Sequence, residues 1–529
     1  MGHSMTRSLS TGRLAVAVAH AQAALAVHAP DLVDAYLQAL PAAADAVGRR
    51  LRAALIREDL TPDTGGGHRH AFHRVEFDSA GADDPVALLP DALPGNAAGF
   101  AAELRNAVIN LAVATARPGR VDAADPDAEA VNLERLAVAG HNLHPCGRTR
   151  LGWDTTDVLA YDLEAGRTTI GFVAVRADTH LGDDVGAALR LAYPELPAPP
   201  PGYRLQPVHP WQRDNRFAGL VADGVLRLVD AELPAAPTAA LRTLLLPAGA
   251  DGRRHYAKVS LDIQVTSTRR SISVASTRNG PAISTLLHSL VADDPDASRI
   301  LLMAETAGAA VPAGTGRDVA AILRDGLTGR LAVGERAVPG GALPFLLGAL
   351  VEESGLGPRA WLNAYAKLLL PPLLRLTARG VALEAHLQNC LPTFVGGRPH
   401  RLGVRDFAGL RLHPGRLAAA GRQVALWPGS VVGTADETVL RAKIGYTAIQ
   451  AHLGELIIAL GATHALDEAA AWRTVRAVVD ETYDALPGAR ADHAAFTAPT
   501  VPHKALVRMR LLGGGDAYLD VENPLHAPA

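Results

Sequence analysis

The chain has 529 residues, of which 48% are hydrophobic and 20% are charged. This composition is typical of folded globular proteins and excludes a largely disordered chain. A formal net charge of -3 provides no strong field that would attract a polyanion, so nucleic acid is not an expected partner. The length exceeds what one hydrophobic core usually supports, and it predicts roughly two to four structural regions.

Cysteine usage and apolar segments indicate the compartment. Cys146 and Cys390 are too few to build a disulfide framework for a chain of this length, which fits a reducing environment. The Ala-rich N-terminal segment is interrupted by Arg13 and His20, unlike a signal peptide. The apolar run Leu368–Leu374 is far shorter than the roughly 20 residues that cross a bilayer. We therefore expect a cytoplasmic protein with no membrane partner.

The first predicted elements along the chain are helices. Apolar residues recur at three- and four-residue spacing over residues 12–57 and 98–116, as amphipathic helices require. Apolar and polar residues alternate from Phe72 to Phe77 and from Thr168 to Val175, which predicts half-buried strands. Five of the ten residues from Tyr193 to Gly202 are proline, so neither helix nor sheet can continue through them. We place a boundary between regions there.

Beyond this boundary, the pattern predicts strands at residues 256–266 and 271–276 and helices over residues 343–378. No fixed-period repeat is visible. The predicted fold class is therefore α+β, with a mainly helical region at 1–200, a region of mixed strands at 201–340, and a region of helices and sheet at 341–529.

The first candidate site is the polar turn from Gly140 to Gly152, which contains two histidines and two arginines. Glycine and proline let the backbone approach a ligand closely, and Arg148 or Arg150 can clamp a phosphate or carboxylate with two hydrogen bonds. A surface loop with solvated cations is the alternative. A zinc site at the two histidines is weakly indicated, because no further ligands follow at a usual spacing.

The second candidate site is the segment from Lys258 to Arg270, which we interpret as a strand. Its alternate apolar residues can face a core, which leaves Lys258 and Thr266 on the other face. A lysine at the start of that row, with Thr266, Ser267 and Arg270 at its end, offers cations and hydroxyl donors to a triphosphate. Upstream, Arg242 and Thr243 add a further cation and hydroxyl. An ordinary sheet with one solvated face is the alternative.

The third candidate site combines Glu384–Asn389 with Arg405–Gly409. If the first piece is extended, Glu384, His386 and Gln388 share one face. The oxygen-bearing side chains of this site are hard ligands of the kind that magnesium prefers: Glu384, Gln388, Asn389 and Asp406. The alternative for His386 is a buried histidine with a structural hydrogen bond.

Three further segments are weaker candidates. Gln206–Gln212 can be a rigid turn that packs Trp211, and Lys504–Arg510 can be an edge strand with solvated cations. The histidines between His68 and His73 can bind a metal, although histidines in a Gly-rich loop are more often simply exposed.

Taken together and in this order, these segments resemble the NRPS-independent siderophore synthetases, the family of the aerobactin synthetases, over about residues 130–515. Gly140–Gly152 is similar to the family's Gly-His-Pro-x-His-Pro-x-x-Lys-x-Arg-x-Gly element, and Val208–Gln212 to its His-Pro-Trp-Gln element. Three more segments match those that build its nucleotide and carboxylate site: Lys258–Arg270, Glu384–Asn389 and Arg405–Gly409.

The resemblance implies a cupped-hand fold of thumb, fingers and a kinase-like palm that holds ATP. It also implies an ATP-dependent ligase that activates citrate or a related di- or tricarboxylic acid as an acyl-adenylate, with release of AMP and pyrophosphate. The acyl group then passes to an amine or hydroxylated amine in siderophore biosynthesis. ATP and Mg2+ are the implied cofactors, and a homodimer is compatible with the resemblance.

The resemblance also implies roles for individual residues. The catalytic residues would be His386, Arg270 and Lys258. The ATP contacts would be His144, Arg148, Arg150, Lys258, Thr266, Ser267, Arg270, Gln388 and Asp406. The substrate contacts would be Arg242, Thr243, His386, Lys504 and Arg510. The magnesium ligands would be Glu384, Asn389 and Asp406.

Three positions depart from the family pattern. Asn142 stands where proline is usual, Arg148 where lysine is usual, and Ala240 where serine is usual. Loss of the serine hydroxyl at position 240 leaves the identity of the acid open. Two other functions also stay open at this point, namely a kinase-like phosphotransferase and a catalytically silent nucleotide-binding homologue.

Overall fold

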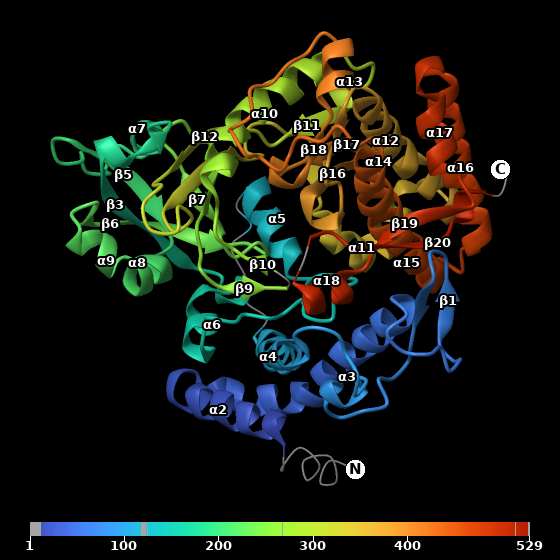
Figure 1. Ribbon diagram of the computed structural model, residues 1–529, viewed down its shortest axis with the longest axis horizontal. Helices are drawn as coiled ribbons and strands as arrows, with labels where there is room; N and C mark the ends of the chain where they lie inside the picture. Colours follow the sequence, from blue (N-terminus) through green and yellow to red (C-terminus); the bar gives the residue numbers. More distant parts are fainter. Residues whose placement is uncertain (1–11, 118–122, 124, 267, 514, 527–529) are drawn as a thin grey trace.

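The computed structural model describes residues 12–117, 123, 125–266, 268–513 and 515–526. Figure 1 shows three parts: N-terminal helices at the base of the view, a large sheet at the left, and C-terminal helices around a smaller sheet at the right. This mixture of helices and sheets confirms the predicted α+β class. In the described part of the chain, no helix combines the length and the hydropathy that a membrane crossing requires.

The N-terminal helices agree with the apolar spacing. The chain forms α2 (Arg13–His28), a short 3-10 turn (Pro30–Leu32), α3 (Val33–Arg57) and α4 (Ala97–Ala116). The side chain of Asn96 accepts a hydrogen bond from the Gly99 amide and caps α4. α3 and α4 pack around large buried side chains, including Tyr36, Leu51 and Phe100. α5 (Pro126–Glu134) and α6 (Thr155–Tyr161) complete this part.

The strand predicted at Phe72–Phe77 is shorter than expected. β1 (His68–His70) and β2 (Arg74–Glu76) form a hairpin. Phe72 and His73 lie in the left-handed region, with φ of 58° and 54°, and make the turn between the strands. Alternation alone does not show that two of its residues belong to a turn.

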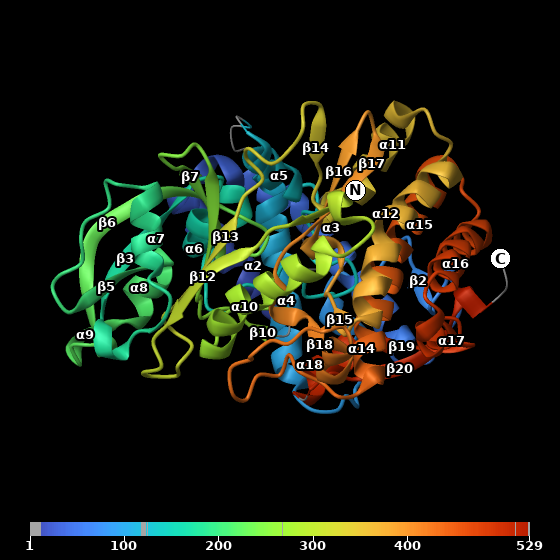
Figure 2. The ribbon, with the colours of Figure 1, turned by 90° about the horizontal axis from the view of Figure 1, so that it is seen from above.

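An eight-stranded antiparallel sheet forms the left part of the molecule, with strand order β4-β12-β13-β8-β7-β6-β3-β5. Its strands are β3 (Thr168–Arg176), β4 (Leu181–Gly182), β5 (Tyr203–Val208), β6 (Leu226–Pro237), β7 (Thr243–Ala248), β8 (Arg254–Val259), β12 (Glu305–Ala310) and β13 (Ala320–Asp325). The helices beside it are α7 (Val185–Ala192), α8 (Pro210–Arg216), α9 (Ala218–Ala222) and α10 (Val274–Ala292). Figure 2 shows α7, α8 and α10 lying along this sheet.

The large sheet extends across one expected region boundary, and one expected strand is replaced by a helix start. β3 and β4 precede the Pro-rich segment and β5 follows it, so the boundary at residues 200 and 201 falls inside one sheet. Proline ends the local element, but it does not decide which strands pair across it. The strand predicted at 271–276 is wrong, because Ser273 caps α10 and accepts a hydrogen bond from the Ser276 amide.

The right part contains a four-stranded sheet of order β11-β17-β16-β14. Its strands are β11 (Ile300–Leu302), β14 (Glu335–Ala337), β16 (Cys390–Val395) and β17 (Arg398–Val404). Two of them precede residue 341, so the second region boundary also crosses a sheet. The helices around it are α11 (Leu343–Ser354), α12 (Pro358–Ala378), α14 (Glu437–Ile444), a π-helical segment (Gly445–Leu453), α15 (Gly454–His464), α16 (Glu468–Asp484) and α17 (Arg490–Phe496).

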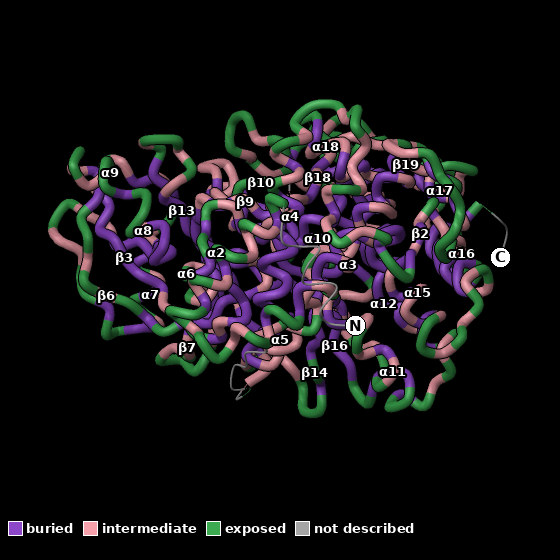
Figure 3. Tube along the Cα trace, turned by 90° about the horizontal axis from the view of Figure 1, so that it is seen from below, coloured by how far each residue is buried: buried purple, intermediate pink, exposed green. Residues whose placement is uncertain are grey.

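Shorter elements connect these parts. They are the strand pairs β9 (Gln264–Val265) with β10 (Thr268–Arg269), β15 (Val381–Ala382) with β18 (Arg411–Leu412), and β19 (Thr500–Lys504) with β20 (Tyr518–Glu522), and the helices α13 (Pro414–Ala419) and α18 (Leu506–Leu512). Figure 3 shows buried backbone through the middle of the molecule and exposed segments mainly in loops at its edge.

The N-terminal helices and the C-terminal helix α18 meet at Glu58. Its carboxylate is fully buried and accepts hydrogen bonds from the amides of Val507, at 3.1 Å, and Arg508, at 2.8 Å. These amides belong to the first turn of α18, so Glu58 satisfies donors that a helix start leaves free. The Arg508 guanidinium donates in return to the Glu58 carbonyl at 2.7 Å.

Candidate active site

The centre of the candidate site is Lys258, which lies near the end of β8 between two carboxylates. Its Nζ is 2.6 Å from Oδ1 of Asp406 and 4.0 Å from Oε1 of Glu305. Asp406 follows β17 and has a left-handed backbone, with φ of 61°. Glu305 begins β12, and neither of its oxygens has a hydrogen-bond partner in the described structure. Lys258 and Asp406 are among the predicted site residues, whereas Glu305 is not.

The two carboxylates have opposite pKa shifts. Burial raises the pKa of Glu305, although the positive charge of Lys258 opposes this shift. Burial also works to raise the pKa of Asp406, but Lys258 and Arg242 outweigh it and hold the pKa well below its usual range. Asp406 is therefore an anion across the physiological pH range, whereas Glu305 is destabilised as an anion.

Arg242 and Arg270 supply two further cations. Nη1 of Arg242 donates to the carbonyls of Arg270, at 2.9 Å, and Ser271, at 3.0 Å. Among the described residues, the Arg270 guanidinium makes only long contacts, of 3.4 Å, to the Val265 carbonyl and the Thr266 hydroxyl. Within the described residues, neither guanidinium forms an ion pair with a carboxylate. Burial and the charge of Arg242 lower the pKa of Arg270, which an anionic ligand would counteract.

The hydroxyl residues around these cations have different surroundings. Thr243 pairs with Lys258 across β7 and β8, so their side chains share a face of the sheet. Its buried Oγ1 has no partner among the described residues. Thr266 is left-handed, with φ of 55°, and donates to the Val265 carbonyl at 2.5 Å. Ser267 lies outside the described residues.

Along the Lys258–Arg270 segment, burial alternates only from Leu261 to Thr266, because Lys258 and Ser260 are also buried, and the segment is not one continuous strand. Its apolar residues are buried as predicted: Val259, Leu261, Ile263 and Val265. β8 ends at Val259, and the chain then makes the short β9–β10 hairpin. This change of direction brings Arg270 close to Arg242, which a single straight strand would not do.

A second lysine and carboxylate pair lies on the C-terminal side of the site. Nζ of Lys443 is 2.9 Å from Oε1 of Glu384. Burial works to raise the pKa of Glu384, but Lys443 and His386 lower it overall. Burial lowers the pKa of His386, so its imidazole is neutral at physiological pH. Nζ of Lys504 pairs with Oδ1 of Asp516 at 2.8 Å, and its charge also acts on Glu384.

The Glu384–Asn389 segment is extended only at its start. Leu387–Asn389 is a 3-10 turn, and Glu384, His386 and Gln388 are each more exposed than the buried Ala385 and Leu387 between them. The Asn389 side chain donates to the Glu384 carbonyl at 3.0 Å. Gln388 is exposed, and its carbonyl accepts from Nε of Arg405 at 3.0 Å. Arg405 also pairs with buried Glu134.

The predicted magnesium ligands provide suitable atoms but not a preformed cluster. No group of three or more His, Cys, Asp or Glu side chains that could hold a metal occurs among the residues described here. Asp406 and Glu384 instead engage Lys258 and Lys443. One oxygen of each carboxylate accepts no hydrogen bond from the described chain, and neither does the side-chain oxygen of Asn389. Hard oxygens of this kind suit Mg2+.

Arg148 and Arg150, predicted as ATP contacts, both have acidic partners within the protein. Both are buried and lie in an ion-pair network with Asp162 and Glu164, which are also buried. Nε of Arg150 is 2.8 Å from Asp162, and Nη1 of Arg148 is 3.2 Å from Glu164. Carboxylates from the next helix and turn occupy donors that the sequence assigned to a phosphate.

Two more predicted residues have structural partners. His144 is buried, its Nδ1 accepts from the Cys146 amide at 3.0 Å, and burial lowers its pKa to about 3. Arg510 binds both oxygens of Glu103, with Nε distances of 2.7 and 2.9 Å. The turn around His144 also depends on Gly140, where φ is 72° and an added Cβ would lie 2.7 Å from the Gly147 carbonyl oxygen.

The chain matches two family models. Residues 129–344 match the IucA / IucC family, and residues 359–519 match the model described as a ferric iron reductase FhuF-like transporter. Among curated proteins, it is 26% identical over 453 residues to a citryl-spermidine/3,4-dihydroxybenzoyl-citryl-spermidine:spermidine ligase of Bacillus anthracis, an alignment that covers 74% of this chain and 71% of the relative.

Solved structures show the same fold. The petrobactin biosynthesis protein AsbB of Bacillus anthracis matches with a TM-score of 0.80 and 20% identity, over 94% of this chain and 98% of that chain. ATP-bound aerobactin synthetase IucA of Klebsiella pneumoniae matches with a TM-score of 0.70 and 20% identity, over 91% and 99% of the two chains. Together with the ordered motifs, these matches assign residues 129–344 to the IucA / IucC family and show the fold of the two solved proteins over 91% or more of the chain.

Proposed function

We propose that this protein is an ATP-dependent carboxylate–amine ligase of siderophore biosynthesis that acts on citrate or a related acid. The observation that carries the proposal is the convergence of Lys258, Arg242 and Arg270 beside Asp406 and Glu384. The arginines have no acidic partner among the described residues, which suits anionic ligands. The relative from B. anthracis is named as a ligase of citryl-spermidine, and the aerobactin synthetase has been solved with ATP.

The proposed first step joins the acid to AMP. A carboxylate oxygen of the acid attacks the α-phosphorus of ATP, the bond to the β-phosphate breaks, and pyrophosphate leaves. Two anions must approach each other, so cations around them lower the barrier. Lys258 and Arg270 are suited to the phosphates, and Arg242 to the acid. In the second step an amine nitrogen attacks the acyl carbon, AMP leaves, and the amine loses a proton.

Magnesium would be held by Asp406, Asn389 and Glu384 in this proposal. The ion neutralises phosphate charge when it is bound. Lys258 and Lys443 now contact two of these ligands, so they would turn from the carboxylates to the phosphates. Neutral His386 can donate one hydrogen bond to the acid without adding charge. We infer further that the three parts of the fold correspond to the thumb, fingers and palm.

Product analysis with a matched pair of arginine variants tests the proposal. Wild-type protein with ATP and Mg2+, given a panel of acids and amines, should release AMP and pyrophosphate only when an acid is present. Arg270→Ala should lower this rate by roughly a hundredfold or more, because it removes a cation from the charged transition state. Arg269→Ala is the control, since Arg269 is exposed and pairs with Asp262.

The products also separate the alternatives. ADP as the sole nucleotide product would indicate a phosphotransferase, and no nucleotide product with any acid would indicate a silent homologue. Equal loss of activity in both arginine variants would remove Arg270 from the proposed phosphate site.

A further inference from the structure

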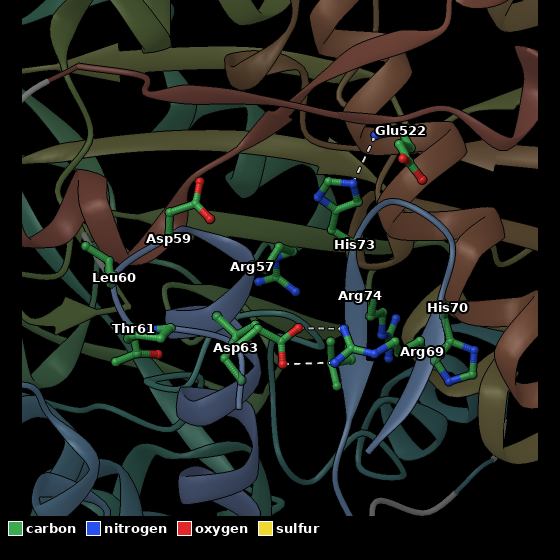
Figure 4. A pocket seen from close by; sticks show the side chains of 13 residues that line it. Arg57, Asp59, Leu60, Thr61, Asp63, Arg69, His70, His73, Arg74 and Glu522 are labelled. Carbon is green, nitrogen blue, oxygen red and sulfur yellow. Dashed lines mark hydrogen bonds and ion pairs between the residues drawn. The ribbon is translucent and has the colours of Figure 1, made fainter. Parts of the chain in front are cut away.

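A large cavity lies away from the candidate active site, between the end of α3, the β1–β2 hairpin and β20 (Figure 4). Its volume is about 700 Å³, within the range of small-molecule sites. None of its lining residues belongs to the candidate active site around Lys258. Polar residues gather around it, and apolar side chains including Ile56, Leu60 and Val75 form part of its wall.

Arg57 is the buried cation of this cavity. It is 5% exposed, and its Nε and Nη2 atoms have no hydrogen-bond partner in the described structure. Figure 4 shows its guanidinium between Asp59 and His73. Burial lowers the pKa of Arg57, while the neighbouring Glu58 partly offsets this shift. A buried guanidinium without a partner is costly for the fold unless a ligand completes its hydrogen bonds.

The other cations of the cavity already have partners. Arg69 pairs with Asp63 at 2.7 Å. Arg74 pairs with Glu455 at 2.6 Å and with Glu76, the last residue of β2, at 2.7 Å. The two imidazoles of the lining also have partners: Nδ1 of His70 lies 2.8 Å from Oε2 of Glu468, and Nε2 of His73 accepts from the Glu522 amide at 3.4 Å.

Two acidic residues of the lining are available to a positively charged group of a ligand. Asp59 and Glu522 are exposed, and in the part of the chain that is described their carboxylates accept no hydrogen bond and form no ion pair. Asp63 is already used by Arg69. Counting only partners from the described chain, the cavity therefore offers one buried cation and two exposed anions that are not paired.

We propose that this cavity binds an amino-acid zwitterion, with its carboxylate on Arg57 and its ammonium group near one of the two carboxylates, Asp59 or Glu522, which lie on opposite sides of His73 in Figure 4. A guanidinium matches a carboxylate with paired hydrogen bonds, and desolvation at Arg57 strengthens them. The exposed carboxylates match an ammonium group, which stays partly hydrated. The occupant is a free amino acid or a larger amide that retains an amino-acid end, and the volume admits both.

Calorimetric titration in the absence of ATP tests the site with four probes. Ornithine represents the free amino acid and Nδ-acetylornithine the amide, while succinate lacks the ammonium group and putrescine lacks the carboxylate. The titrations use full-length protein carrying Arg270→Ala, so that carboxylate binding at the active site contributes little. Because no catalysis is measured, the outcome does not depend on whether the proposed ligase activity is correct.

Arg57→Met should weaken binding of the zwitterionic probe by at least about tenfold. Arg52→Met is the matched control, because Arg52 lies on the same helix, stacks over Phe77 at 3.9 Å and does not line the cavity. It should leave binding unchanged. Of the two amino-acid probes, the one that binds more tightly identifies the source of the ligand.

Equal binding by the Arg57→Met and Arg52→Met proteins would overturn the proposal. Asp59→Asn with Glu522→Gln provides a second test at exposed positions that should not disturb folding. This double variant should weaken ornithine or Nδ-acetylornithine binding and strengthen succinate binding. Unchanged affinities for both classes of probe would show that the cavity does not recognise a zwitterion.

Discussion

Replacement of Lys258 by methionine tests the charge arrangement at the centre of the site. The lysine side chain is 3% exposed and lies between Asp406 and Glu305. Methionine keeps most of the volume but removes the charge. Glu305 then faces a second carboxylate from a position that is 1% exposed, with no donor from the described chain.

The expected cost follows from the two carboxylates. Breaking a buried ion pair by removing one partner destabilises a protein by roughly 3–5 kcal/mol. Asp406 is 25% exposed and can be hydrated after the change, so we expect about 3 kcal/mol, the lower end of that range. Adenylation should also fall by roughly a hundredfold or more, because a phosphate cation is lost.

The loss of stability should depend on pH. Burial already raises the pKa of Glu305, and removal of Lys258 raises it further. A raised pKa in the folded state means that folding favours proton uptake, so acidification stabilises the variant relative to its unfolded chain. The difference in stability from wild type should therefore be largest near pH 8 and should shrink as the pH falls toward 5.

Thermal and urea unfolding at these two pH values provide the assay. Lys258→Met combined with Glu305→Gln should recover much of the stability at pH 8, because the buried charge is gone. Lys367→Met is the control, since its pair with Glu481 is 44% and 66% exposed and should contribute little. A deficit that is identical at both pH values and unchanged by Glu305→Gln would refute the reasoning.

Three further predictions concern residues around the site. Asp406→Asn should raise the Mg2+ concentration required for half-maximal pyrophosphate release by about tenfold or more, and an unchanged magnesium titration in folded protein would remove this ligand. Arg148→Lys should lower the free energy of unfolding by about 2–3 kcal/mol without changing KM for ATP, because lysine cannot reproduce the paired hydrogen bonds of the buried network. A raised KM for ATP at an unchanged melting temperature would instead support a role for Arg148 in ATP binding. Arg510→Met should lower the melting temperature and leave KM for the acid unchanged, since its guanidinium is committed to Glu103, whereas a selective rise in KM would contradict this structural role.

The sequence predicted helices and strands well where apolar residues keep one regular spacing along the whole element. The spacing of apolar residues predicted α3 and α4, and alternation predicted β3. The same alternation correctly assigned Val259 and Ile263 to the core, although the strand itself stops at Val259. The strand prediction at 271–276 failed because a short alternating run and a helix cap use the same residue types.

Partners distant in the sequence could not be predicted from such patterns. Nothing near Arg148 shows that Glu164 will occupy its donors, and nothing near Arg510 points to Glu103. Glu305 lies in an Ala-rich segment with no motif of its own, yet strand pairing places it beside Lys258. Electrostatic roles depend on tertiary neighbours, so the motifs named residues that converge around Lys258 but did not show which cations have an acidic partner in the described part of the chain.

The contact between Glu58 and α18 has a consequence for how the protein folds during synthesis. Its hydrogen bonds join residues 449 and 450 positions apart, among the most distant contacts in the chain. When α3 leaves the ribosome, the donors for the Glu58 carboxylate have not yet been made, so that carboxylate must stay hydrated or protonated. The N-terminal helices are therefore expected to reach their final packing only after nearly the whole chain has emerged. Until then, the apolar faces of those helices are candidates for protection by chaperones.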